Sequence, residues 1–191
     1  SRIFCDPERF ADDSKESMAK VGMGVLYNKT DDGRTMRIIS SDLRERILNE
    51  FYFKHHSMLS RAVKYQLQTY GKALILDCHS FPNTPLKRSV HKTIPRPDIN
   101  IGTDNFHTPQ NLIDISVEYF TGRNFTIGIN YPFNGTIVPM KYYNKNPKVE
   151  SIMLEINRKL YLKERSNEKS EQYKITKWAV QEYINLLRNI L

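Results

Sequence analysis

Hydrophobic positions along the chain follow two spacings in turn, one typical of strands and the other of helices. Short apolar runs predict strands at Val21–Tyr27, Ala73–Leu76, Asp98–Ile101, Phe125–Ile129 and Ser151–Ile156. Apolar residues three or four positions apart predict helices over 41–51, 59–70, 109–121 and 171–191. This alternation predicts an α/β fold in which helices cover a sheet.

Polar residues follow or interrupt three of the predicted strands. Asp77 and His79 come directly after the second strand, which we expect to be a buried central strand. Asn130 and Tyr131 follow another strand, and Glu155 lies within the last. Because α/β sheets bind ligands at the carboxyl ends of their strands, we expect these side chains to meet at one site.

The composition is that of an ordinary globular protein and indicates a single domain over residues 1–191. Apolar residues make up 39% of the chain and charged residues 26%, which allows a real core. The apolar runs are shorter than the roughly 18 residues of a membrane span. Cys5 and Cys78 both lie in apolar runs, so we expect buried, reduced thiols in a cytoplasmic protein.

The chain is basic, with 29 Lys and Arg, 21 Asp and Glu, and a net charge of +8. The two signs are interspersed along most of the sequence, which favours a solvated basic surface that attracts small anions. Nucleic-acid binding is the alternative, and it requires stacking aromatic residues on a basic face. The sequence has no phosphate-binding glycine loop, dinucleotide fingerprint or Gly-x-Ser-x-Gly elbow. This argues against nucleotide-binding proteins and serine hydrolases of the α/β-hydrolase type.

Asp77 and His79 form an Asp-x-His motif that suits a metal site. An imidazole binds a metal through one nitrogen while a neighbouring group fixes its other N–H. A satisfied polar pair at a strand end is the alternative. Glu155 interrupts an apolar strand, where a carboxylate is costly to bury. It is a candidate general base, and the alternative is an ion pair with Arg158.

The N-terminus and the start of one predicted helix supply further candidates. Arg2, Asp6 and Arg9 lie close together in the sequence. Asp6 would orient an arginine whose guanidinium binds a substrate carboxylate as a fork, and a structural salt bridge is the alternative. His55 and His56 are adjacent, so we expect one of them to face a site and the other, His55, to face solvent.

Several short blocks occur in a characteristic order from the first residue to about Leu162. They are Ser1-Arg2 with DPERF at 6–10, VGMGVLY at 21–27, DCHSFP at 77–82, IGT at 101–103 with Thr108-Pro109, NYPFNG at 130–135 with Val138-Pro139, and SIMLEINR at 151–158. Each block is weak alone, but together they are specific. The chain resembles the N-formylglutamate amidohydrolase family over this length.

The resemblance implies a phosphorylase/hydrolase-like fold similar to that of the zinc carboxypeptidases, an α/β fold with a mixed central sheet flanked by helices on both faces. It implies one zinc ion and a zinc-bound water that cleaves the amide of N-formyl-L-glutamate or a similar N-acyl acidic amino acid. The expected partner is this small anionic amino acid derivative, and neither nucleic acid nor membrane is expected.

The resemblance also assigns roles to individual residues. His79 matches a zinc ligand, and Glu155 matches the general base that activates the water. Catalytic zinc takes about three protein ligands, and the resemblance implies that the remaining ligands lie before Ser1. The residues assigned to substrate binding are Arg2, Arg9, His56, Asn130 and Tyr131, with Asp6 and Asp77 behind them in supporting positions.

Two alternatives to this assignment remain open. Within the same enzyme class, the bond cleaved is another linear amide or a short peptide end. In a different class, the chain is a small-molecule or protein-binding domain of the same fold that has lost its metal site. A measured content of about one zinc per chain would favour the enzyme, and a protein without zinc would favour the binding domain.

Overall fold

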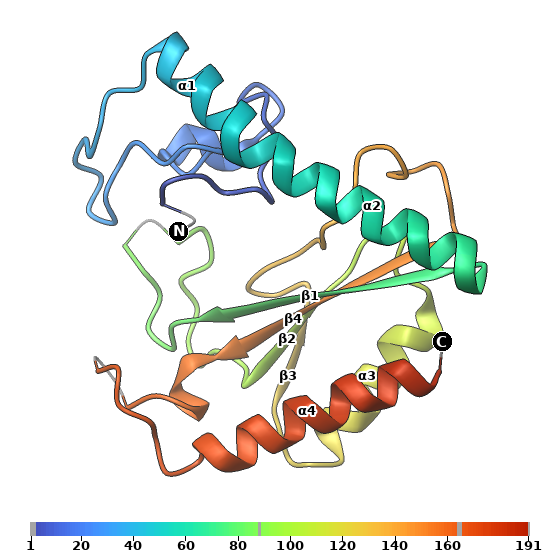
Figure 1. The fold of residues 1–191 in the computed structure, drawn as a ribbon. Coiled ribbons are helices and arrows are strands. Elements are labelled where there is room, and N and C mark those ends of the chain that lie inside the picture. Colours follow the sequence, from blue (N-terminus) through green and yellow to red (C-terminus); the bar gives the residue numbers. More distant parts are fainter. Residues whose placement is uncertain (1–2, 88, 164–165, 191) are drawn as a thin grey trace. The chain divides into compact units, whose positions relative to one another are not determined.

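The computed structural model describes residues 3–87, 89–163 and 166–190, and the chain divides into two compact units (Figure 1). The first unit comprises Ser1–Lys64 and Leu86–Val90, and the second comprises Tyr65–Pro85 and His91–Leu191. Within the described ranges, no helix has both the length and the apolar character that a membrane span needs.

The second unit is built on a four-stranded mixed sheet with the strand order β1-β4-β2-β3. The strands are β1 (Ala73–Phe81), β2 (Ile99–Gly102), β3 (Ile127–Ile129) and β4 (Val149–Asn157). Strand β1 is parallel to β4 and β2 is parallel to β3, whereas β2 and β4 are antiparallel. The predicted α/β fold with a mixed sheet and helices is confirmed.

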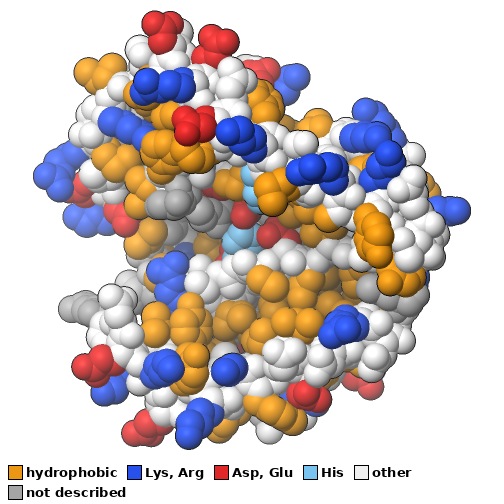
Figure 2. All heavy atoms as spheres, in the orientation of Figure 1, with side chains coloured by type: hydrophobic (Ala, Val, Ile, Leu, Met, Phe, Trp, Pro, Cys, Tyr) orange, Lys and Arg blue, Asp and Glu red, His pale blue; other side chains and the backbone are white. Residues whose placement is uncertain are grey.

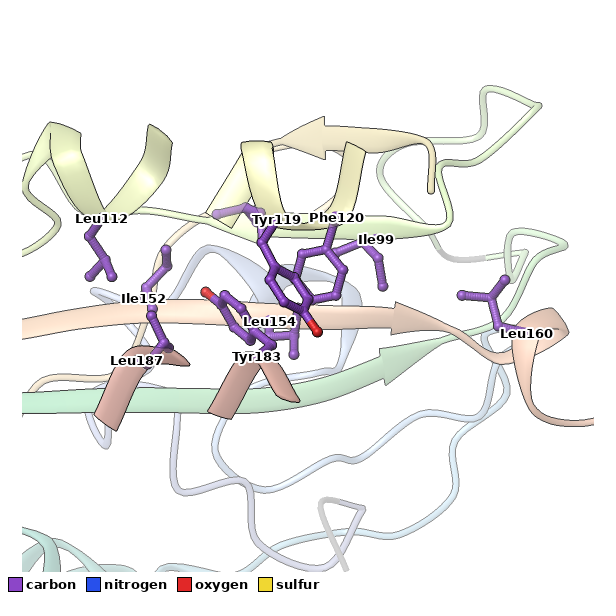
Figure 3. Close-up of a cluster of buried hydrophobic side chains, with 10 residues drawn as sticks. Ile99, Leu112, Tyr119, Phe120, Ile152, Leu154, Leu160, Tyr183 and Leu187 are labelled. Carbon is purple, nitrogen blue, oxygen red and sulfur yellow. The ribbon is translucent and has the colours of Figure 1, made fainter. Parts of the chain in front are cut away.

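Helices α3 (Gln110–Thr121) and α4 (Tyr173–Asn189) contribute to one hydrophobic core with the sheet (Figure 3). Strand side chains alternate between faces, so every second residue of β4 enters this core. Ile152 and Leu154 are fully buried there. Burying each such side chain stabilises the fold by about 2 kcal/mol. The alternate residues of β4, among them Met153 and Glu155, project from the opposite face of the sheet. A short 3-10 turn, η3 (Arg158–Leu160), follows β4.

The first unit is helical and irregular. Its elements are the 3-10 helix η1 (Ser17–Val21), α1 (Ser41–Ile47), a π-helical segment η2 (Leu48–Tyr52) and most of α2 (Phe53–Tyr70). Ser40 caps α1, because its Oγ accepts a hydrogen bond from Leu43 N–H at 3.2 Å. Val25, Leu26 and Ile47 are buried together in the core of this unit.

Three predictions drawn from the apolar runs are wrong. The segment Val21–Tyr27 is not a strand, because Gly22 at φ 78° ends η1 in the left-handed region and the following residues form a buried loop. Strand β1 is not central; it lies at one end of the sheet order and continues past His79. Cys78, on this end strand, is consequently exposed rather than buried.

Candidate active site

A row of polar side chains crosses the sheet on the face opposite α3 and α4. His79 on β1 and Glu155 on β4 are register partners, so both side chains project from the same face. Asn100 on β2 is the antiparallel register partner of Glu155 and extends the row. Pairing across three strands therefore brings together three residues that are far apart in the sequence.

Asp77 lies on the same face as His79, two residues earlier on β1. His79 Nε2 is 2.7 Å from Asp77 Oδ1, and the two side chains are only 9% and 10% exposed. The backbone N–H of Ile137 donates to the other carboxylate oxygen, Asp77 Oδ2, at 3.2 Å. The carboxylate is thus held by the backbone and in turn orients the imidazole.

The Asp77–His79 pair fits part of a zinc site. Imidazole nitrogen and carboxylate oxygen are both ordinary zinc ligands, and here they lie close enough to serve one ion. Alternatively, only His79 would bind the metal: Asp77 would hold the ring through Nε2, and Nδ1 would be the ligand atom. Because catalytic zinc takes about three protein ligands, these two donors would supply only part of such a coordination.

Glu155 lies on β4, between β1 and β2, and is 6% exposed. Arg158 is the partner expected if Glu155 were only structural. Its Nε and Nη2 instead donate to the hydroxyl and the carbonyl of Ser80, each at 3.3 Å. Glu155 is thus a buried carboxylate on the strand next to that of its register partner, His79.

The loop after β3 is hydrogen-bonded to two residues, Asn100 on β2 and Thr103 directly after β2. Asn100 Nδ2 donates to Phe133 O, and Asn100 Oδ1 accepts from Tyr131 N–H, both at 2.9 Å. Asn130 exchanges two bonds with Thr103: its Oδ1 accepts from Thr103 N–H at 2.8 Å, and its Nδ2 donates to Thr103 Oγ1 at 2.7 Å. The Asn130 amide therefore holds the loop that carries Tyr131.

The predicted residues of the first unit form their own group. Arg9 Nε lies 3.5 Å from Asp6 Oδ2, and Asp6 is fully buried. His56 Nε2 is 2.7 Å from Pro7 O. Burial lowers the pKa of His56, so the ring is neutral at pH 7 and donates this bond. Arg2 lies outside the described residues, and the assignment of Arg2 and Arg9 to a substrate carboxylate stays a prediction.

His107 and Arg96 are among the other polar residues buried in the second unit. His107 is fully buried: its Nδ1 bonds Val149 O at 2.7 Å, and Asn144 N–H donates to its Nε2 at 2.9 Å. Both ring nitrogens thus serve the fold, which gives His107 a structural role. Arg96 is 3% exposed and is not marked by any sequence pattern, because it lies in an irregular basic segment before β2.

On the face shown in Figure 2, Lys and Arg side chains are spread out, with hydrophobic and acidic side chains between them. In the second unit, Lys159 Nζ lies 2.9 Å from Asp98 Oδ1, and Lys163 Nζ lies 2.8 Å from Glu168 Oε2. This distribution matches the solvated basic surface expected from the interspersed charges.

The fold and the polar row define a mixed α/β protein whose sheet carries a metal-binding type of residue beside a buried carboxylate. A family model described as N-formylglutamate amidohydrolase matches residues 1–162. The crystal structure of N-formylglutamate amidohydrolase from Ralstonia eutropha JMP134 has a TM-score of 0.83 to this chain at 20% identity, covering 100% of this chain and 76% of that one. No curated protein sequence matches the chain. The chain belongs to the N-formylglutamate amidohydrolase family.

Proposed function

We propose that this protein is a zinc-dependent amidohydrolase that cleaves the amide of N-formyl-L-glutamate or a similar N-acyl acidic amino acid. The pairing of His79 with Glu155 on one face of the sheet carries the proposal. It sets a nitrogen of the kind that binds zinc beside a carboxylate able to move a proton. Membership of an amidohydrolase family supports the reaction class.

His79, with Asp77 beside it, would hold the zinc. When bound, zinc polarises the acyl carbonyl and makes water more acidic. Asp77 keeps the imidazole in one orientation, because its own carboxylate is fixed by the Ile137 N–H. A ring held in this way presents the same nitrogen in every turnover.

Glu155 accepts a proton from the attacking water and delivers it to the nitrogen of the leaving amine. Both transfers require the carboxylate to keep one position relative to the reacting atoms. The central strand supplies that rigidity, since β4 is hydrogen-bonded to β1 on one side and to β2 on the other.

Glu155→Gln tests the proposal, because it keeps the size of the side chain and removes its basicity. We expect kcat to fall by roughly 10²- to 10⁴-fold, with zinc content and melting temperature unchanged. Glu150→Gln is the matched control, because Glu150 lies on the same strand but projects from the other face. Near-full turnover by Glu155→Gln would refute the role. Loss of zinc by that variant would make Glu155 a ligand instead of a base.

A further inference from the structure

Arg96 is a buried cation with an unused donor. Its Nη1 donates to Pro82 O at 3.1 Å and its Nη2 to His91 O at 2.9 Å. Within the described residues, Nε has no hydrogen-bond partner although it is buried. A buried donor on a charged group is expensive to leave unsatisfied, so such an atom calls for a specific explanation. An anionic ligand would provide one.

Aromatic rings fix the orientation of this guanidinium. Its central carbon lies 5.8 Å from the ring centroid of Phe81 and 5.8 Å from that of Phe133. The rings of His91 and Tyr131 meet edge to face at 5.2 Å. Because two bonds and two rings hold Arg96, little conformational entropy is left to lose when a ligand binds.

The electrostatic surroundings link Arg96 to the polar row. Burial lowers the pKa of Arg96, and the negative charge of Glu155 acts against that shift. A guanidinium stays protonated in proteins even so. Arg96 is therefore a permanent positive charge within electrostatic reach of the proposed base.

Arg96 also lies one step along the sheet from the proposed reaction centre. Phe81 and Asn157 are the next register partners on the face that carries His79 and Glu155. Asn157 Nδ2 donates to Pro97 O at 3.0 Å, so the residue that follows Arg96 is hydrogen-bonded to this Phe81–Asn157 pair. Two residues of a strand span about 6.6 Å. Standard bond lengths put the acyl carbon and the side-chain carboxylate of an extended N-acylglutamate roughly 6 Å apart.

We propose that Arg96 binds the side-chain carboxylate of the substrate and thereby selects N-acyl dicarboxylic amino acids. The inference rests on the proposed function, because it places a second carboxylate of the same substrate. A charge-assisted hydrogen bond from Nε would satisfy the buried donor. An uncharged amide in the same place would give Nε only a neutral acceptor, which makes a weaker bond, so the site discriminates between the two groups.

Arg96→Gln in the full-length protein tests the proposal with two substrates of nearly equal shape, N-formyl-L-glutamate and N-formyl-L-glutamine. We expect kcat/KM for the glutamate compound to fall by about 10²-fold and that for the glutamine compound to change by less than about 3-fold. An equal loss on both substrates would make Arg96 a structural brace or a counter-ion of Glu155, and would overturn the proposal. No loss on either substrate would overturn it as well.

Arg123→Gln is the control, because Arg123 also stacks on an aromatic ring, 3.7 Å from the centroid of Tyr119, but it follows α3 and is exposed. We expect Arg123→Gln to leave kcat/KM for both substrates unchanged. If Arg96→Gln fails to fold, Arg96→Lys replaces it, since lysine keeps the charge and should retain part of the preference for glutamate.

A binding measurement separates this inference from the proposed function. If the wild-type protein hydrolyses neither compound, the proposed function fails. Calorimetry with glutarate and its monoamide then decides the inference by itself. Tighter binding of glutarate by wild type, lost in Arg96→Gln, supports a carboxylate site. Equal affinity of the two proteins for glutarate overturns it.

Discussion

Replacing Asn100 with Ala should destabilise the second unit and release the loop that carries Tyr131. The Asn100 side chain is fully buried and makes two hydrogen bonds of 2.9 Å, to Phe133 O and from Tyr131 N–H. Each lost bond costs about 1 kcal/mol, and each backbone group left without a partner adds roughly 1 kcal/mol. Water entering the vacated space restores part of this, so we expect the free energy of unfolding to fall by about 3 kcal/mol.

Urea denaturation followed by the fluorescence of Trp178, the single tryptophan, measures this loss within the same unit. With a slope of about 2 kcal/mol per molar urea, the midpoint should fall by roughly 1.5 M. Asn105→Ala is the control, because Asn105 is exposed in the same unit and its removal should cost less than about 0.5 kcal/mol. A loss for Asn100→Ala below about 1 kcal/mol would show that these two bonds do not hold the loop.

Two further stability predictions concern the same unit. In Gly128→Ala, the new Cβ would lie 2.2 Å from Tyr131 O, so we expect the urea titration to show a loss of about 2 kcal/mol, and unchanged stability would contradict the close approach. Burial raises the pKa of Tyr183 to about 12, so the stability that its neutral phenol contributes is complete below about pH 10 and falls by about 2 kcal/mol as the pH rises to 12. Tyr183→Phe loses the bond to Ser116 Oγ but should show a flatter stability profile between pH 10 and 12, and parallel profiles for the two proteins would contradict the assignment.

Local signals predicted the ends of several elements but not how the strands are arranged. Helices α2 and α3 end at Tyr70 and Thr121, where the helices predicted over 59–70 and 109–121 also end. The position of β1 at the end of the sheet has no such signal, because strand order depends on pairing between distant segments. Short apolar runs indicate burial but not conformation, since residues 24–27 are buried without forming a strand.

The candidate site shows the same division between local and distant information. His79 and Glu155 are conspicuous in the sequence because burying a polar side chain in an apolar strand costs free energy unless it is paired. Their meeting was expected at strand ends, whereas they lie within strands and face each other through the β1–β4 register. Asn100 and Arg96 escape prediction because their importance comes from partners distant in the sequence, Tyr131 and Phe133 among them.

The most direct test of the proposed chemistry is the zinc dependence of N-formyl-L-glutamate hydrolysis by the full-length protein. We expect about one zinc per chain, release of formate and glutamate, loss of turnover after chelation, and its return when zinc is added back. Hydrolysis that continues after complete metal removal, or no turnover by the zinc-loaded protein, would contradict the account.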